Sequence, residues 1–271
     1  MILSTNGAPS VYKHHQEAIN NLITVFKGAP GIVACILGGS VAKGLARPDS
    51  DIDAIVIVTD EKHASLAAER RLSECIFESC PYEGGYFDIK YTTKGYLLEV
   101  KARGSEPARN AFAGAMVLFS GDGEIDEIVL RLGVFQRNEK EEKMRSFYCT
   151  LALNQGYFWN LSQDNTYLRM RTAADILLYG YRLLLEYNEV LFPCHKSLTA
   201  TVERLRAKPD AIVEKGERLL RTLSDEAKKD FVDAVLGFIN YTPPPWSEVL
   251  TQYIDDNEQW WYKNRPVLSE W

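Results

Sequence analysis

The chain has 271 residues, of which 46% are apolar and 25% are charged, as in a globular protein with one large domain or two smaller ones. This composition excludes a disordered chain, and no apolar stretch approaches the roughly 18 residues of a membrane span. The net charge of −6 argues against a nucleic-acid partner, because phosphate-backbone binding needs an excess of basic residues. Few cysteines without metal-ligand spacing, and an N-terminus without signal-peptide features, predict a cytoplasmic protein with reduced thiols.

The first part of the chain, residues 1–136, alternates between strand and helix patterns. Helical spacing of apolar residues predicts a helix over 15–26, and a short apolar run predicts a buried strand over 32–37. The same patterns, with β-branched and aromatic content, predict a strand over 51–58, a helix over 61–75, strands over 86–92 and around 97–101, a helix near 107–112 and a strand over 116–119. This alternation indicates an α/β domain.

From residue 138 onward, long helical patterns replace the strand patterns. We expect helices over 143–160, 167–187, 195–206, 211–220 and 225–239, and a last helix from 246 to about 262 that follows three consecutive prolines. The charged stretch 137–142 is the expected join. The sequence therefore predicts two domains, 1–136 and 137–271, and the second is an all-α helical bundle.

A glycine-rich turn follows the first predicted strand. Gly38 and Gly39 allow the backbone to approach a ligand closely, and exposed amides at the start of the following helical turn favour a phosphate. Ser40 adds a hydroxyl donor. Lys43 and Arg47 come next, either as further phosphate contacts or as exposed basic residues. This segment is typical of a phosphate-binding turn.

Two carboxylates open the second predicted strand. Asp51 and Asp53 share one face of that strand, about 6–7 Å apart, and repel each other unless a cation lies between them. Mg²⁺ prefers carboxylate and phosphate oxygens. Asp88 lies between apolar residues on a later strand and is a third candidate, with pairing to Lys90 as the structural alternative. A phosphate-binding turn beside such a metal site is what nucleotidyl transfer requires.

These motifs together resemble the signature of the DNA polymerase β-like nucleotidyltransferases: Gly-Ser, about ten intervening residues, Asp-x-Asp, and a later strand aspartate. The layout, a core followed by a helical domain, is similar to that of the aminoglycoside and lincosamide nucleotidyltransferases. The resemblance implies a mixed-sheet nucleotidyltransferase core in which Gly39 and Ser40 bind the nucleotide. It implies that Asp51, Asp53 and Asp88 are the catalytic residues and metal ligands, with Asp88 either a ligand or the general base.

The resemblance extends to the link between two helices of the second domain. Residues 187–196 look like an Asn…Phe-Pro…Lys segment found in several small-molecule nucleotidyltransferases. Lys196 is then a further nucleotide-binding residue, with an exposed lysine as the structural alternative.

The expected function is Mg²⁺-dependent transfer of a nucleoside monophosphate, AMP from ATP or from another NTP, to a hydroxyl of a small molecule. The resemblance implies two metal ions and an aminoglycoside- or lincosamide-like acceptor bound by the helical domain. Two alternatives stay open: a protein-adenylylating transferase of a toxin–antitoxin type, and a nucleotide-binding regulator without turnover. The sequence leaves the acceptor, the base and the oligomeric state open.

Overall fold

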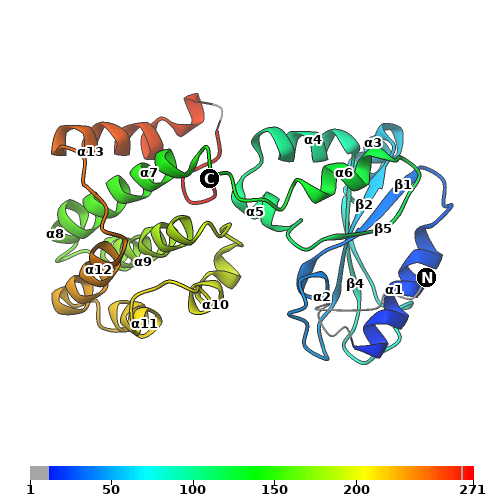
Figure 1. Ribbon diagram of the computed structural model, residues 1–271, viewed down its shortest axis with the longest axis horizontal. Helices are drawn as coiled ribbons and strands as arrows, with labels where there is room; N and C mark the ends of the chain where they lie inside the picture. Colours follow the sequence, from blue (N-terminus) through cyan, green and yellow to red (C-terminus); the bar gives the residue numbers. More distant parts are fainter. Residues whose placement is uncertain (1–11, 264) are drawn as a thin grey trace. The chain divides into compact units, whose positions relative to one another are not determined.

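The computed structural model describes residues 12–263 and 265–271, and the chain divides into two compact units (Figure 1). The first unit comprises the described residues up to Gly104 together with Ala108–Val134. The second comprises Ser105–Pro107 and the described residues from Phe135 to Trp271. The expectation that the N-terminus carries no signal peptide concerns residues 1–11, which lie outside the described residues. Within the described residues, no helix is both long enough and apolar enough to cross a membrane.

A five-stranded mixed sheet forms the centre of the first unit (Figure 1). In spatial order its strands are β3 (Ser73–Ile76), β4 (Phe87–Thr92), β2 (Ile52–Val58), β1 (Ile32–Leu37) and β5 (Met116–Ser120). β2 and β4 are parallel, and the other neighbouring pairs are antiparallel. This pairing confirms the predicted mixed-sheet core.

Each face of the sheet belongs to a separate hydrophobic core. Side chains alternate along a strand, so Ile52 and Val56 of β2 point into the core that includes α1 (Lys13–Phe26). Ile57 points into the opposite core, which includes α4 (Lys94–Arg103) and α6 (Glu124–Leu130). Asp53 lies on this second face near the start of β2, where it is half-buried. On this face, helices cover the later part of β2 around Ile57, and Asp53 at the start of the strand stays partly accessible.

Two predicted elements of this unit are wrong. The strand expected around 97–101 is part of α4, which begins after Thr93; the hydroxyl of Thr93 accepts a hydrogen bond from the Tyr96 backbone N–H at 3.3 Å. Its buried residues Leu97 and Val100 are three positions apart, which is helical and not strand spacing. The helix expected over 61–75 ends earlier, as α3 (Asp60–Ala68), and β3 follows it. β3 pairs with β4, and local helical periodicity does not reveal such a distant partner.

The second unit is all-helical, as predicted. Its α-helices are α7 (Lys140–Leu153), α8 (Trp159–Leu161), α9 (Thr166–Asn188), α10 (Leu198–Glu203), α11 (Ile212–Thr222), α12 (Asp225–Ile239) and α13 (Trp246–Tyr253). Short π-helical segments, Asn154–Phe158 and Ile254–Glu258, extend α7 and α13, so two of the long predicted helices are not continuous α-helices. α9 packs against α7 and α12 around one apolar core. The short α2 (Gly39–Ala42) and α5 (Glu106–Asn110) complete the chain's α-helices in the described residues.

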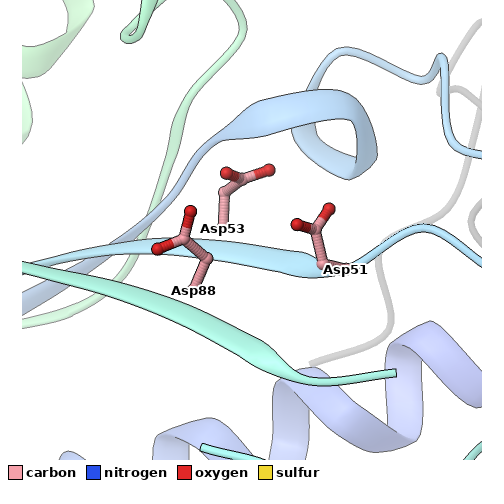
Figure 2. A group of neighbouring side chains, drawn as sticks. All are labelled: Asp51, Asp53 and Asp88. Carbon is pink, nitrogen blue, oxygen red and sulfur yellow. The ribbon is translucent and has the colours of Figure 1, made fainter. Parts of the chain in front are cut away.

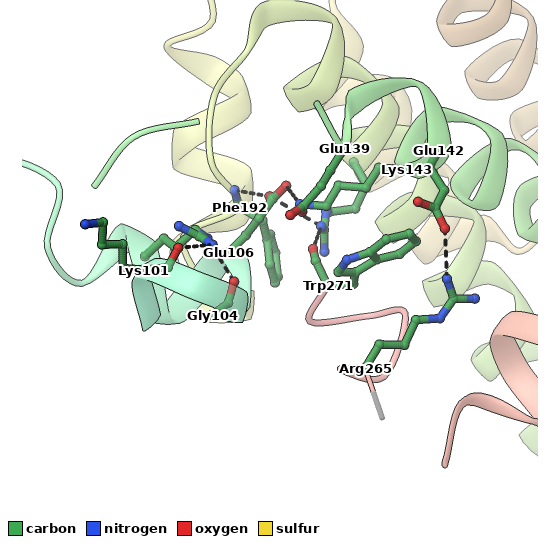
Figure 3. A network of polar contacts seen from close by, with 11 residues as sticks. Lys101, Gly104, Glu106, Glu139, Glu142, Lys143, Phe192, Arg265 and Trp271 are labelled. Carbon is green, nitrogen blue, oxygen red and sulfur yellow. Dashed lines mark hydrogen bonds and ion pairs between the residues drawn. The ribbon is translucent and has the colours of Figure 1, made fainter. Parts of the chain in front are cut away.

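A network of buried charges lies inside the second unit, centred on Glu106 (Figure 3). The carboxylate of Glu106 lies 2.9 Å from Lys143 Nζ and 3.3 Å from a guanidinium nitrogen of Arg182. It also accepts a hydrogen bond from the backbone N–H of Phe192 at 2.7 Å. Glu139 lies 3.1 Å from Lys143, so two carboxylates match the two cations. Such matching is what buried charges require.

Glu186 is a further acidic residue near this network, and neither Lys143 nor Arg182 forms an ion pair with it. It is fully buried, and neither of its carboxyl oxygens has a hydrogen-bond partner among the described residues. Burial, with the negative charge of Glu106, raises the pKa of Glu186 to about 9. The carboxyl group of Glu186 is therefore protonated in the folded protein at neutral pH, whereas in the unfolded chain it loses its proton near pH 4.5. The folded state consequently loses stability as the pH rises from about 4.5 to about 9.

Glu186→Gln should remove this pH dependence, because glutamine is neutral in both states. We expect the variant to match the wild type near pH 5 and to have the larger free energy of unfolding at pH 8.5. Each unit of pH contributes at most about 1.4 kcal/mol to the difference. Urea unfolding at the two pH values measures it, with the exposed Glu203→Gln as the control. A difference that does not grow with pH would show that Glu186 is ionised in the folded protein.

Candidate catalytic site

Three carboxylates come together where β2 and β4 begin (Figure 2). Asp51 immediately precedes β2, Asp53 is the second residue of β2, and Asp88 is the second residue of β4. The parallel register pairs Asp53 directly with Asp88, and the side chains project to the same side of the two strands (Figure 2). One oxygen of each side chain lies within 4.8 Å of the others. The structure thus brings together the three aspartates that the sequence singles out.

This arrangement fits a hard divalent cation. Three half-buried carboxylates at this separation repel one another strongly, and a cation that they share removes the repulsion. Carboxylate oxygens are the ligands that Mg²⁺ prefers. Within the described part of the chain, no other group of three acidic, histidine or cysteine side chains is close enough to hold a metal ion. Asp51, Asp53 and Asp88 are therefore the residues that would hold it.

Gly39 lies directly against Asp53. Its φ angle is +63°, and a Cβ at this position would lie only 1.7 Å from Oδ2 of Asp53. The neighbouring Gly38 donates its backbone N–H to the Asp53 carbonyl oxygen at 3.0 Å. The glycine turn is therefore packed onto the strand that carries the carboxylates, and a residue without a side chain at 39 is what lets Asp53 reach the cluster. Ser40 follows as a half-buried residue of α2.

A pocket of about 140 Å³ lies beside the turn and the carboxylates. The glycine turn, two aspartates and two lysines line it: Gly38, Gly39, Lys43, Asp53, Asp88 and Lys90. The pocket is therefore lined by glycine backbone, which a ligand can approach closely, and by both acidic and basic side chains. Asp53 and Asp88 line it, and Asp51 does not.

Residues 19–94 match the family model described as a nucleotidyltransferase domain. The first unit therefore contains a nucleotidyltransferase domain of the DNA polymerase β-like superfamily. The matched segment contains the glycine turn and all three aspartates. No curated protein matches the chain. A crystal structure of a nucleotidyltransferase-like protein from Exiguobacterium sibiricum 255-15 is similar over 93% of this chain and 81% of that chain, with 13% identity and a TM-score of 0.46.

Tyr86 is a residue of this nucleotidyltransferase site that sequence reasoning missed. It precedes β4 and is two positions from Asp88, so the two share a strand face; that spacing was the available signal. Hydrogen bonding to the Asp51 carboxylate, together with its negative charge, raises the pKa of Tyr86 to about 12. The Tyr86 hydroxyl therefore stays protonated as a donor to Asp51.

Two further ring side chains of the first unit, Tyr82 and His14, hold the loop before Asp51. Tyr82 donates its hydroxyl to the Ser50 carbonyl oxygen at 2.5 Å, and His14 Nε2 lies 2.9 Å from the Pro48 carbonyl oxygen. These contacts fix the chain immediately before the first carboxylate. They are long-range, so sequence spacing gives no sign of them.

The remaining candidates lie elsewhere. Arg47 forms an exposed ion pair with Asp49 at 3.0 Å, which fits its structural alternative. Lys196 is exposed in the short 3-10 helix His195–Ser197 of the second unit. Its part in nucleotide binding by this enzyme stays a prediction, as do the nucleotide contacts of Gly39 and Ser40.

Proposed function

We propose that this nucleotidyltransferase moves a nucleoside monophosphate, AMP from ATP, onto a hydroxyl of a small acceptor in a Mg²⁺-dependent reaction. The observation that carries the proposal is the convergence of Asp51, Asp53 and Asp88 within 4.8 Å of one another beside the glycine turn of a nucleotidyltransferase domain. The complete set of carboxylates argues against a regulator without turnover. The acceptor class is an aminoglycoside- or lincosamide-like compound bound with the help of the helical domain.

The three aspartates would hold two divalent ions, which when bound neutralise the phosphates and lower the pKa of the acceptor hydroxyl. Gly39 and Ser40 bind the triphosphate from the turn, and Lys196 adds a further contact. The acceptor oxygen forms a bond to the α-phosphorus, the bond from that phosphorus to the bridging oxygen breaks, and diphosphate leaves. The proton of the acceptor hydroxyl passes to Asp88 as general base or to solvent.

We expect the acceptor to be cationic, because the chain carries a net charge of −6. At an effective dielectric constant of about 20, a cation 4 Å from a carboxylate gains about 4 kcal/mol before desolvation, and a nucleic-acid phosphate is repelled by as much. Turnover of ATP should therefore be fastest with an aminoglycoside, and salt should raise its KM. The measurement compares an aminoglycoside, a lincosamide and a short RNA at low and high salt. Transfer to RNA, or salt-independent transfer to a neutral acceptor, would contradict this expectation.

Exposed aromatic side chains favour the protein-adenylylating alternative. Four large rings of the second unit are 60–78% exposed: Tyr167, Trp246, Trp261 and Tyr262. Exposed apolar side chains of this size occur at protein-interaction surfaces. Incubation of a cell lysate with ATP labelled at the α-phosphorus separates the two candidates, because the label would then appear on a protein band and not on small molecules.

A further inference from the structure

We propose that Lys90, together with Lys43, binds the β- and γ-phosphates of the nucleotide and retains the diphosphate as it leaves. The inference rests on the proposed function and assigns to it a residue that the sequence suggests only as a partner of Asp88. Both lysines line the pocket that the Gly38–Gly39 turn and the two paired aspartates also line.

Lys90 is placed on the catalytic face by the strand itself. It follows Asp88 by two residues on β4 and pairs in register with Ile55 of β2, so its side chain projects from the same face as Asp88. Its Nζ lies 3.7 Å from Asp88 Oδ2, and 62% of the side chain is exposed. An ion pair that long and exposed stabilises the fold little. The ammonium group is therefore available to a ligand in the pocket.

The nearby Lys94 shows what a structural lysine looks like in the same unit. Its Nζ lies 2.6 Å from both Asp122 and Glu124, and only 31% of its side chain is exposed. These two ion pairs neutralise the charge of Lys94 and stabilise the turn before α6. Lys90 has no comparable short contact with a carboxylate among the described residues.

Lys43 lines the same pocket from the segment that follows the glycine turn. It follows α2 directly, and its Nζ donates a hydrogen bond to Asn110 Oδ1 at 2.6 Å. This bond helps to orient the ammonium group of Lys43, which lines the pocket together with Lys90. Two ammonium groups and approachable glycine backbone around one small pocket are suited to an anion.

The charges of the substrate favour the diphosphate end of the nucleotide as that anion. A nucleoside triphosphate brings about four negative charges close to three carboxylates, and ammonium groups on the pocket side reduce the repulsion. The ammonium groups stabilise the transition state more than the bound substrate, because negative charge accumulates on the diphosphate as its bond to the α-phosphorus breaks. Lysine binds phosphate as a point charge, so Lys90 exchanges its weak contact with Asp88 for a stronger one with the diphosphate.

The test uses inorganic diphosphate with Mg²⁺, titrated into the full-length protein by calorimetry. We expect Lys90→Met and Lys43→Met each to weaken diphosphate binding at least tenfold, and Lys90→Arg to restore most of the affinity. Lys101→Met, at an exposed position of α4, is the matched control and should bind as the wild type does. Thermal melts of each variant check the fold.

Unchanged diphosphate affinity in Lys90→Met would overturn the proposal. A loss of Mg²⁺ affinity alone, with diphosphate affinity retained, would also overturn it, because Lys90 would then act only on Asp88. In turnover, we expect Lys90→Met to raise the KM for ATP and to weaken product inhibition by diphosphate. Diphosphate binding needs no acceptor, so a wild-type protein that binds diphosphate without transferring nucleotide would contradict the proposed function and not this assignment.

Discussion

Asp53→Asn should reduce nucleotidyl transfer at least about a hundredfold and leave the fold intact. Asparagine is nearly isosteric with aspartate, but it removes the central charge of a cluster whose oxygens lie within 4.8 Å of one another. Loss of one carboxylate ligand should cost about 3 kcal/mol of transition-state stabilisation, which corresponds to that factor. Steady-state release of diphosphate from ATP, with an acceptor that supports turnover, measures the effect.

Asp49→Asn is the matched control for this variant. Asp49 lies two residues before Asp51, is exposed, and pairs only weakly with Arg47 across a surface contact of 3.0 Å. Its substitution should change turnover less than threefold. If Asp51→Asn and Asp53→Asn also leave turnover within a factor of three, the acidic cluster does not perform the chemistry.

Gly39→Ala should eliminate most of the activity through Asp53 and not through loss of space for the phosphate. The added Cβ would lie 1.7 Å from Asp53 Oδ2 and 2.4 Å from its Cγ, so the carboxylate has to leave the cluster. A φ of +63° adds strain of about 1–2 kcal/mol for any residue with a side chain. We expect activity to fall at least a hundredfold, as in Asp53→Asn, and the melting temperature to fall as well.

Gly28→Ala separates the two effects of that substitution. Gly28 has a φ of +85°, and nothing lies within 4 Å of the position that an added methyl group would take. This variant should lose comparable stability and keep its activity. Equal activity of Gly39→Ala and Gly28→Ala would show that the position of Asp53 does not depend on residue 39.

Local spacing was enough to single out the three aspartates. An i, i+2 pair on a strand and a lone polar residue on another strand are patterns that the sequence displays directly. Their approach to one another depends on the parallel register of β2 with β4, which no local pattern contains. The need for glycine at position 39 could not be predicted from local sequence either. It arises because a side chain there would clash with the carboxylate of Asp53 on a different strand.

The errors in the fold have a similar origin. The segment 97–101 alternates like a strand, and only the Thr93 cap and the burial of Leu97 with Val100 show it to be helical. β3 is four residues long and forms because β4 offers it a partner. The helices α9 and α12 of the second unit were predicted well because their periodicity extends over several turns. The position of Lys196 relative to the nucleotide depends on tertiary structure, which periodicity does not describe.

Binding of Mn²⁺ in the presence of a non-hydrolysable ATP analogue tests the central claim most directly, because it requires no acceptor. Electron paramagnetic resonance of free Mn²⁺ reports how much of the ion the protein takes up during a titration. The wild type and Asp49→Asn should take up the ion with equal affinity, and Asp53→Asn should bind it at least tenfold more weakly. Equal uptake by the wild type and Asp53→Asn would contradict the assignment of Asp51, Asp53 and Asp88 as the metal-binding centre of this nucleotidyltransferase.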